Sequence, residues 1–229
     1  PRRSSDLDYY LYSTGRADRD MQDGRLSLDP PRDQPPDRYI YDPNDPVPTV
    51  GGNHSICWPD AFHVIQPGPF DQRAVEARPD VLTYTTPALE ADTEVTGPIV
   101  LHLYAATDGP DTDWTAKLVD VHPDGRAINL TEGNLRARFR RSIHETPELL
   151  EPGRTYAYEI EIQPTSNVFR RGHRIRLEVS SSNFPLWDRN PNTGHKPGQD
   201  AELRIARQTV YHDAEHPSRL VLPMIPAGA

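Results

Sequence analysis

The chain has 229 residues, a formal net charge of −9 and a mean hydropathy of −0.74. This acidic balance argues against non-specific binding to nucleic acid or to an anionic membrane, because nothing steers a polyanion toward the surface. The sequence contains no apolar run long enough for a membrane span and no recognisable signal peptide. We therefore expect neither nucleic acid nor membrane as a partner, and the location stays open, with the cytoplasm favoured.

Proline and strand signals together predict the fold class. The 25 prolines are about twice the usual share, which is typical of short strands joined by long loops. No long segment has the 3.6-residue period of a helix. Many short strands with turns between them predict an all-β fold, a jelly-roll β-sandwich with long irregular N-terminal segments. Strands are expected at 8–13, 25–28, 38–41, 81–84, 95–106, 114–122, 127–140, 154–163, 174–180, 203–211 and 220–222.

Domain organisation follows from where these signals become regular. We expect one domain over 1–229. Within it, 1–80 holds a strand and long wrapping loops, 81–223 is the main sandwich and 224–229 is a tail. The chain starts at Pro1 without a methionine, so we expect it to be part of a longer polypeptide.

Two charged patterns predict solvent-facing strand surfaces. In 174–180, three apolar residues point one way and three charged residues the other, which is typical of a strand with one wet face. The arginines near 136–141 alternate with apolar neighbours and are expected on the wet face of 127–140. Cys57 is the single cysteine, so no internal disulfide or cysteine-based zinc site exists, and packing beside Trp58 is expected.

A serine hydrolase triad is the first candidate chemistry. Ser181, Asp188 and His195 occur in the chain order of α/β-hydrolases. Such enzymes expose their serine on a Gly-x-Ser-x-Gly turn, and the chain has none. The hydroxyls near Ser181 are therefore expected to cap a turn at the end of a strand.

Metal and sugar sites are the other candidates. The acidic run Asp108, Asp111 and Asp113 lacks the glycine and distal glutamate of a calcium loop, and its proline suits a hairpin turn. The group formed by 212–216 (His212, Asp213, Glu215 and His216) is expected in an exposed, solvated turn. We therefore expect no metal and no cofactor. Trp58, Trp114 and Trp187 provide the surface that a sugar stacks on, but packing is the favoured role of each.

Four segments carry a family resemblance. They are 39–52, 68–73 with 78–84, 111–121 with Asp124-Gly125, and 172–194. In this order they resemble the C-terminal domain of the CocE/NonD family of serine hydrolases, which includes cocaine esterases, glutaryl and α-amino-acid ester acylases and X-Pro dipeptidyl-peptidases. The resemblance runs from about Tyr9 to Pro223.

The resemblance implies a jelly roll similar to galactose-binding-like domains, which follows an α/β-hydrolase domain and a helical cap. The family's triad lies in the α/β-hydrolase part, so no catalytic residue is expected in this chain. The partner implied is that catalytic domain, in the same polypeptide, and a homodimer stays open. The jelly roll is expected to pack on the catalytic domain and to help wall its substrate pocket. The expected wall residues are His54, Trp58, Phe62, Phe70, Asp71, Gln72, Phe184 and Trp187.

Two alternatives remain at this point. One is a free-standing jelly roll that binds carbohydrate or another ligand. The other is a self-sufficient hydrolase that uses Ser181, Asp188 and His195.

Overall fold

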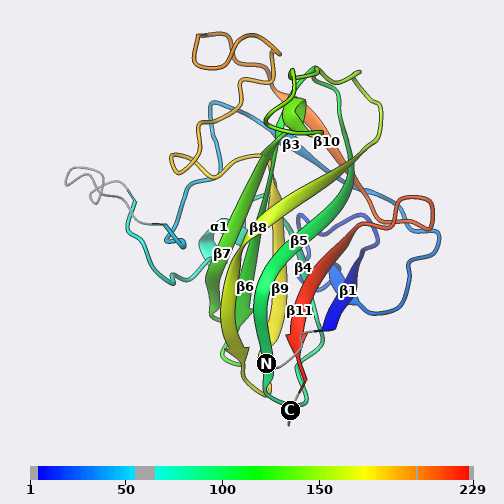
Figure 1. Cartoon of the computed structure of the whole chain (residues 1–229), viewed down its shortest axis with the longest axis vertical. Helices are drawn as coiled ribbons and strands as arrows, with labels where there is room; N and C mark the ends of the chain where they lie inside the picture. Colours follow the sequence, from blue (N-terminus) through cyan, green and yellow to red (C-terminus); the bar gives the residue numbers. More distant parts are fainter. Residues whose placement is uncertain (1–4, 55–64, 200, 227–229) are drawn as a thin grey trace.

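The computed structural model describes residues 5–54, 65–199 and 201–226, and the regular secondary structure in these residues is almost entirely β-strand (Figure 1). One short helix, α1 (Arg73–Glu76), and one 3₁₀ turn, η2 (Ala137–Phe139), interrupt them. The strands are β1 (Ser5–Tyr12), β2 (Arg25–Ser27), β3 (Asp37–Tyr41), β4 (Leu82–Thr85), β5 (Thr93–Thr107), β6 (Asp113–Val121), β7 (Ala127–Arg136), β8 (Tyr156–Phe169), β9 (Arg174–Ser180), β10 (Ala206–Tyr211) and β11 (Arg219–Ile225).

A single continuous ladder folds over into two layers. Its order is β3-β10-β5-β11-β1-β2-β4-β9-β6-β7, and β8 pairs with the free side of β5. Because β8 also packs against β6 and β7, the part of the ladder formed by β5 and β8 faces the end formed by β6 and β7, and the core lies between them. The close approach is visible at Gly133 on β7, where a Cβ would lie 2.1 Å from the carbonyl oxygen of Glu161 on β8. The expected all-β sandwich is confirmed, while the expected domain limits stay a prediction.

The core lies between these layers, with β6 at its centre. Every residue of β6 is buried, because β7 and β9 flank the strand and β8 crosses over it. Trp114 is fully buried, with its ring 5.7 Å from that of Tyr158. Burying a side chain of this size stabilises the fold by roughly 2–3 kcal/mol. Trp114 is therefore a packing residue, as the sequence favoured.

Strand β7 is shorter than predicted, and Arg136 and Arg138, at and after its end, do not form a solvent-exposed strand face. The strand ends at Arg136, and η2 replaces the remainder. Arg138 is buried, and its Nε lies 2.8 Å from Oδ2 of Asp111. Arg136 donates from Nε to Oδ1 of Asp113 over 2.9 Å. The prediction was wrong because two buried carboxylates require counter-ions, which the chain supplies by bending inward.

The same contacts decide the acidic run at 108–113. Asp111 and Asp113 are buried, so they do not lie in an open hairpin turn. Asn190 donates from Nδ2 to both carboxylates at 2.8 Å. Arginine and amide donors occupy these oxygens, so the carboxylates take part in buried structural contacts and do not form a calcium loop.

His212 also departs from the exposed turn that the sequence predicted. Its ring is fully buried, with Nε2 2.9 Å from Oδ2 of Asp37. Ser13 and Tyr84 donate to the same carboxylate oxygen at 2.7 and 2.8 Å. Asp213 and His216 remain near the surface as a partly buried pair. His212 continues the alternation of β10, in which Ala206, Gln208 and Val210 are the buried residues, so the error was to assign it to the turn after the strand.

The outer face of β9 is the largest correction. Ile175, Leu177 and Val179 are buried as expected, but Arg176 and Glu178 are buried as well. A covering layer of α1 and the chain before it excludes water from this face. The resulting ionic layer joins strands β6 and β9 to that cover. It consists of Gln72, Glu76, Lys117, Arg176 and Glu178.

Within the ionic layer, Arg176 lies 2.7 Å from Glu76, while the nitrogen of Lys117 lies 3.8 Å from Glu178. Burial raises the pKa of Glu178 to about 8, and Lys117 only partly opposes this rise. Glu178 is therefore the member of the layer whose charge is least favoured in the folded state.

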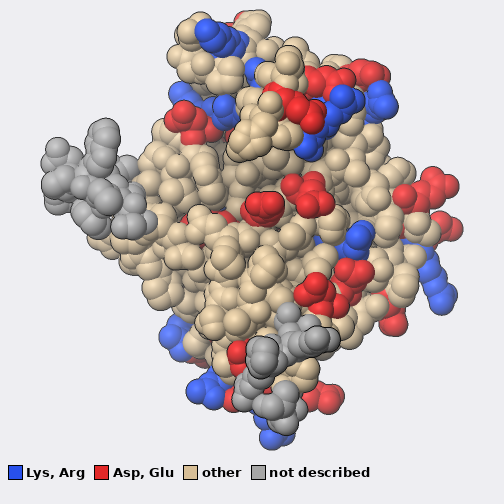
Figure 2. Space-filling model, in the orientation of Figure 1, with Lys and Arg blue, Asp and Glu red and all other residues tan. Residues whose placement is uncertain are grey.

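Charges elsewhere are mixed. Figure 2 shows acidic and basic side chains interspersed around one face of the molecule, so no continuous basic patch lies on that face. No helix in the described ranges is long and apolar enough to cross a membrane.

Glu178 predicts how stability depends on pH. The unfolded chain releases this proton near the ordinary glutamate pKa of 4.5, whereas the folded chain keeps it up to a pKa of about 8. The folded state binds more protons across this window, so the free energy of unfolding falls as the pH rises through it. Urea unfolding at several pH values should show Glu178→Gln removing on the order of 2 kcal/mol of that fall.

Glu161→Gln, an exposed change on β8, is the matched control and should leave the fall intact. An unchanged pH dependence in Glu178→Gln would contradict the assignment.

Candidate functional site

Three stretches of irregular chain that are far apart in the sequence lie side by side beside β7 and β9. They are 47–54, 65–72 and 183–187, and we call them the wall segments. In Figure 1 the first two run outward from the edge of the sheet near β7. They contain His54, Phe70, Asp71, Gln72, Phe184 and Trp187. Trp58 and Phe62, the other expected wall residues, lie outside the described residues, as does Cys57.

Two glycines, Gly52 and Gly68, join the first wall segment to the second. Gly52 donates its N–H to the carbonyl of Gly68 over 2.9 Å, and Gly68 returns the bond over 3.0 Å. Gly52 has a φ of +131°, and a Cβ there would lie 2.3 Å from Oε1 of Glu132. Only glycine satisfies both the backbone angle and the close approach. The loop therefore begins and ends at one fixed point on the sheet.

The second wall segment is hydrogen-bonded to the edge of β7. Phe70 donates its N–H to Oδ1 of Asn129 over 2.7 Å, and Gln72 donates to the carbonyl of Ala127 over 2.7 Å. Gln72 is fully buried and its amide donates to the carbonyl of Val50 over 2.8 Å. Gln72 is therefore an anchor between two wall segments rather than an exposed surface residue.

Asp71 faces outward beside Gln72. It lies 2.6 Å from Arg73, and the hydrogen bonds from that guanidinium lower its pKa to about 2. One of its oxygens also accepts the N–H of Ala127 over 3.2 Å. Asp71 is thus held in place as a carboxylate by its neighbours on the chain.

Glu132 on β7 is a site residue that the sequence did not indicate. It is buried, and it accepts the N–H of Asn53 over 3.1 Å. Burial raises its pKa, while Lys117 and His54 oppose the rise. The ring of His54 is half-buried and lies 3.2 Å from the carbonyl of Gly51. Among the described residues, the second oxygen of Glu132 has no hydrogen-bond partner.

The third segment is joined to the first by main-chain bonds. Phe184 donates to the carbonyl of Val47 over 2.9 Å, and Thr49 donates to the carbonyl of Phe184 over 2.8 Å. Phe184 and Phe70 are each 37% exposed, and Trp187 is half-buried. The structure therefore brings the described members of the expected wall into one connected unit with aromatic rings at its surface.

The serine of the alternative triad is not available for catalysis. Ser181 is 1% exposed, and its hydroxyl lies 2.9 Å from the Tyr39 hydroxyl and 3.0 Å from the Gln208 amide. Asp188 and His195 are exposed. A hydroxyl buried among structural partners cannot reach a substrate, and this one joins β3 and β10 instead of capping a turn as the sequence predicted.

Comparison with known proteins agrees with the absence of a serine hydrolase triad among Ser181, Asp188 and His195. Residues 1–221 match the family described as the X-Pro dipeptidyl-peptidase C-terminal non-catalytic domain. The chain belongs to this family. The resemblance to the C-terminal domain of CocE/NonD-family hydrolases is thereby confirmed, and the sandwich described above is the non-catalytic domain of that family.

Three relatives show how much of a protein this domain represents. A cocaine esterase from Rhodococcus sp. (strain MB1 Bresler) is 44% identical over 95% of this chain and 37% of that protein. A solved aminopeptidase from a marine sediment Thaumarchaeota archaeon is 30% identical, with a TM-score of 0.83 over 97% of this chain and 37% of its own. An α-amino acid ester hydrolase is 32% identical, with a TM-score of 0.78 over 95% of this chain and 36% of its own. The chain spans just over a third of the length of each of these three relatives.

In this non-catalytic domain, the glycine at the loop base predicts a stability effect. Gly52→Ala should lower the free energy of unfolding by about 2–3 kcal/mol, because the new Cβ meets Glu132 in a strained backbone region. Gly125→Ala is the matched control: its φ is +89°, but a Cβ there meets nothing within 4 Å. The control should cost about 1 kcal/mol. Equal losses in urea unfolding would show that Glu132 does not constrain the loop base.

Proposed function

We propose that this chain is the accessory β-sandwich of a serine hydrolase that cleaves esters or amides. In this proposal it packs on an α/β-hydrolase catalytic domain of the same polypeptide, and the wall segments form one side of the substrate pocket. The catalytic serine belongs to that other domain, where an acyl-serine forms and is then released to water.

One observation carries the proposal. Three wall segments from distant parts of the sequence are fixed to one another by reciprocal main-chain bonds, such as those between Gly52 and Gly68. The same unit leaves Phe70 and Phe184 partly exposed. Irregular chain that a rigid scaffold holds this firmly is typical of a recognition surface, and exposed aromatic rings are typical of contact with an apolar partner or substrate.

The named activities of the relatives support the reaction class. They are an esterase, an aminopeptidase and an α-amino acid ester hydrolase, and each name denotes hydrolysis of an ester or an amide. An acyl group is common to these reactions. A pocket that receives acyl groups benefits from an apolar wall, because an apolar wall discriminates by the size of the group it contacts.

Kinetics of the full-length polypeptide test the wall. Phe70→Ala should lower kcat/KM for bulky acyl substrates by about 3- to 30-fold, because the truncated wall loses apolar contact with the acyl group. Trp58→Ala should act in the same direction. Val168→Ala, on β8, is the control: Val168 is 43% exposed and lies outside the wall segments, so it should leave kcat/KM unchanged. Native kinetics together with native stability in both wall variants would rule the wall out.

Association of the 229-residue chain tests the packing face. Separated from a catalytic domain, the chain should associate at high concentration more than its net charge of −9 implies, because Phe70 and Phe184 stay partly exposed. Replacing both with serine should reduce the apparent mass in light scattering, and Val168→Ser should not. A sharp monomer for the unmodified chain would contradict the prediction. A discrete dimer of the full-length polypeptide is a separate proposal, tested by its mass.

A further inference from the structure

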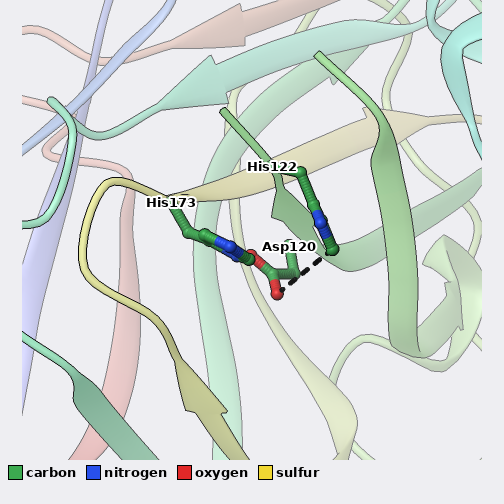
Figure 3. Close-up of side chains that lie close together, drawn as sticks. All are labelled: Asp120, His122 and His173. Carbon is green, nitrogen blue, oxygen red and sulfur yellow. Dashed lines mark hydrogen bonds and ion pairs between the residues drawn. The ribbon is translucent and has the colours of Figure 1, made fainter. Parts of the chain in front are cut away.

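Three metal-ligating side chains meet where β6 ends and β9 begins. They are Asp120 in β6, His122 directly after it and His173 directly before β9. One donor atom of each lies within 4.8 Å of the other two. Figure 3 shows the two imidazole rings beside the Asp120 carboxylate, and the ring centroids of His122 and His173 lie 4.3 Å apart. The pocket wall and the ionic layer do not involve these residues.

The strand register brings these residues together. Strands β6 and β9 are antiparallel neighbours, with Asp120 opposite Ile175. His122 is two residues beyond Asp120, so both side chains leave the chain on the same side. Tight turns fix the two histidine backbones: His122 accepts the N–H of Gly125 over 2.9 Å, and His173 donates to the carbonyl of Arg170 over 3.0 Å. The donors are thus held in place before any ligand arrives.

The donor spacing is close to that of three ligands around one ion, with one hydrogen bond formed among them. Nδ1 of His173 lies 2.8 Å from one oxygen of Asp120, whereas Nε2 of His122 lies 3.8 Å from the other. The second distance is too long for a hydrogen bond. Tetrahedral zinc with bonds of about 2.0–2.1 Å places its donors roughly 3.3 Å apart, and the two distances lie on either side of that value. Small side-chain rotations bring both into range.

We propose that Asp120, His122 and His173 bind one Zn²⁺ or a similar divalent transition-metal ion. Two imidazoles and one carboxylate are a donor set that suits this class of ion. Their side chains are 12%, 26% and 14% exposed, so the site is shielded and still reachable. His122 lines a groove of about 860 Å³, also lined by Arg174. A water molecule or a small anion would complete the coordination shell.

Arg126 is the group that competes with the ion. Its Nη2 donates to Nδ1 of His122 over 3.3 Å, and its Nε donates to Asp124 over 2.8 Å. An ion on Nε2 of His122 places the ring proton on Nδ1, facing the guanidinium. Arg126 must then turn toward Asp124. Its side chain is 52% exposed, so this movement is open to it.

Metal titration of the chelator-stripped 229-residue chain tests the site. If circular dichroism shows that this chain is unfolded, the full-length polypeptide is titrated instead. Zn²⁺ in competition with a chromophoric chelator should bind at one ion per chain, and Co²⁺ should give visible bands of a four- or five-coordinate ion. His122→Gln, His173→Gln and Asp120→Asn should each weaken Zn²⁺ binding by about 10-fold or more.

Two further variants separate this site from a simple ion pair. His216→Gln breaks a comparable pair, 3.1 Å from Asp213, and should leave Zn²⁺ affinity unchanged. Arg126→Ala removes the competing cation and should tighten binding roughly 3-fold. His122→Gln leaves the hydrogen bond between His173 and Asp120 intact, so this variant is expected to stay folded. Its loss of Zn²⁺ affinity would then report the loss of a ligand. Absence of Zn²⁺ binding at about 100 µM, or binding that survives the three ligand substitutions, overturns the proposal.

Discussion

Water exclusion from the outer face of β6 and β9 is the constraint on which the rest of the structure depends. Lys117 and Glu178 stand on these strands where an ordinary sandwich is wetted, and the chain before α1 covers them. Charged groups removed from water are tolerated only when other groups satisfy them. The cover must therefore supply polar partners in fixed positions, and Gln72 and Glu76 do so. The ordered path of this irregular chain is a consequence of burying those charges.

The positions of the wall segments are fixed by contacts with this cover. Gln72 receives the Lys117 ammonium on its oxygen and donates from its amide to the carbonyl of Val50. One side chain thus transmits the position of β6 to the first wall segment. Glu132 continues the link on β7 through Asn53. A surface that recognises substrate needs such support, since a loop alone cannot hold aromatic rings in one place. Gln72 and Glu132 therefore hold the wall segments in position.

The strand pattern was predictable, and the polar interior was not. Period two located the strands to within a few residues, because each apolar face had to meet the core whatever the topology. The main errors involve charged residues, although β8 also runs beyond its predicted end at 163, to Phe169. Arg138, His212 and Glu178 are buried because of partners that lie far away in the chain, such as Asp111 and Asp37. Local sequence shows that a residue is charged, but it does not show whether a counter-ion awaits it. For the same reason the sequence analysis did not indicate the cluster: Asp120 and His122 are close in the chain, but His173 became their neighbour only through the pairing of β6 with β9.

The position of the histidine pair on the sheet connects it with the wall. His122 lines the same groove as Arg73 and Glu76, the first and last residues of α1. Gln72, directly before that helix, accepts Lys117 and bonds the edge of β7 at Ala127, which stands opposite Val121 at the end of β6. The end of β6 is therefore a common support for the wall anchor and for the histidines. An ion that fixes Asp120 against His173 would restrain this strand end, and the restraint would reach the wall through Gln72 without any change in the aromatic rings themselves.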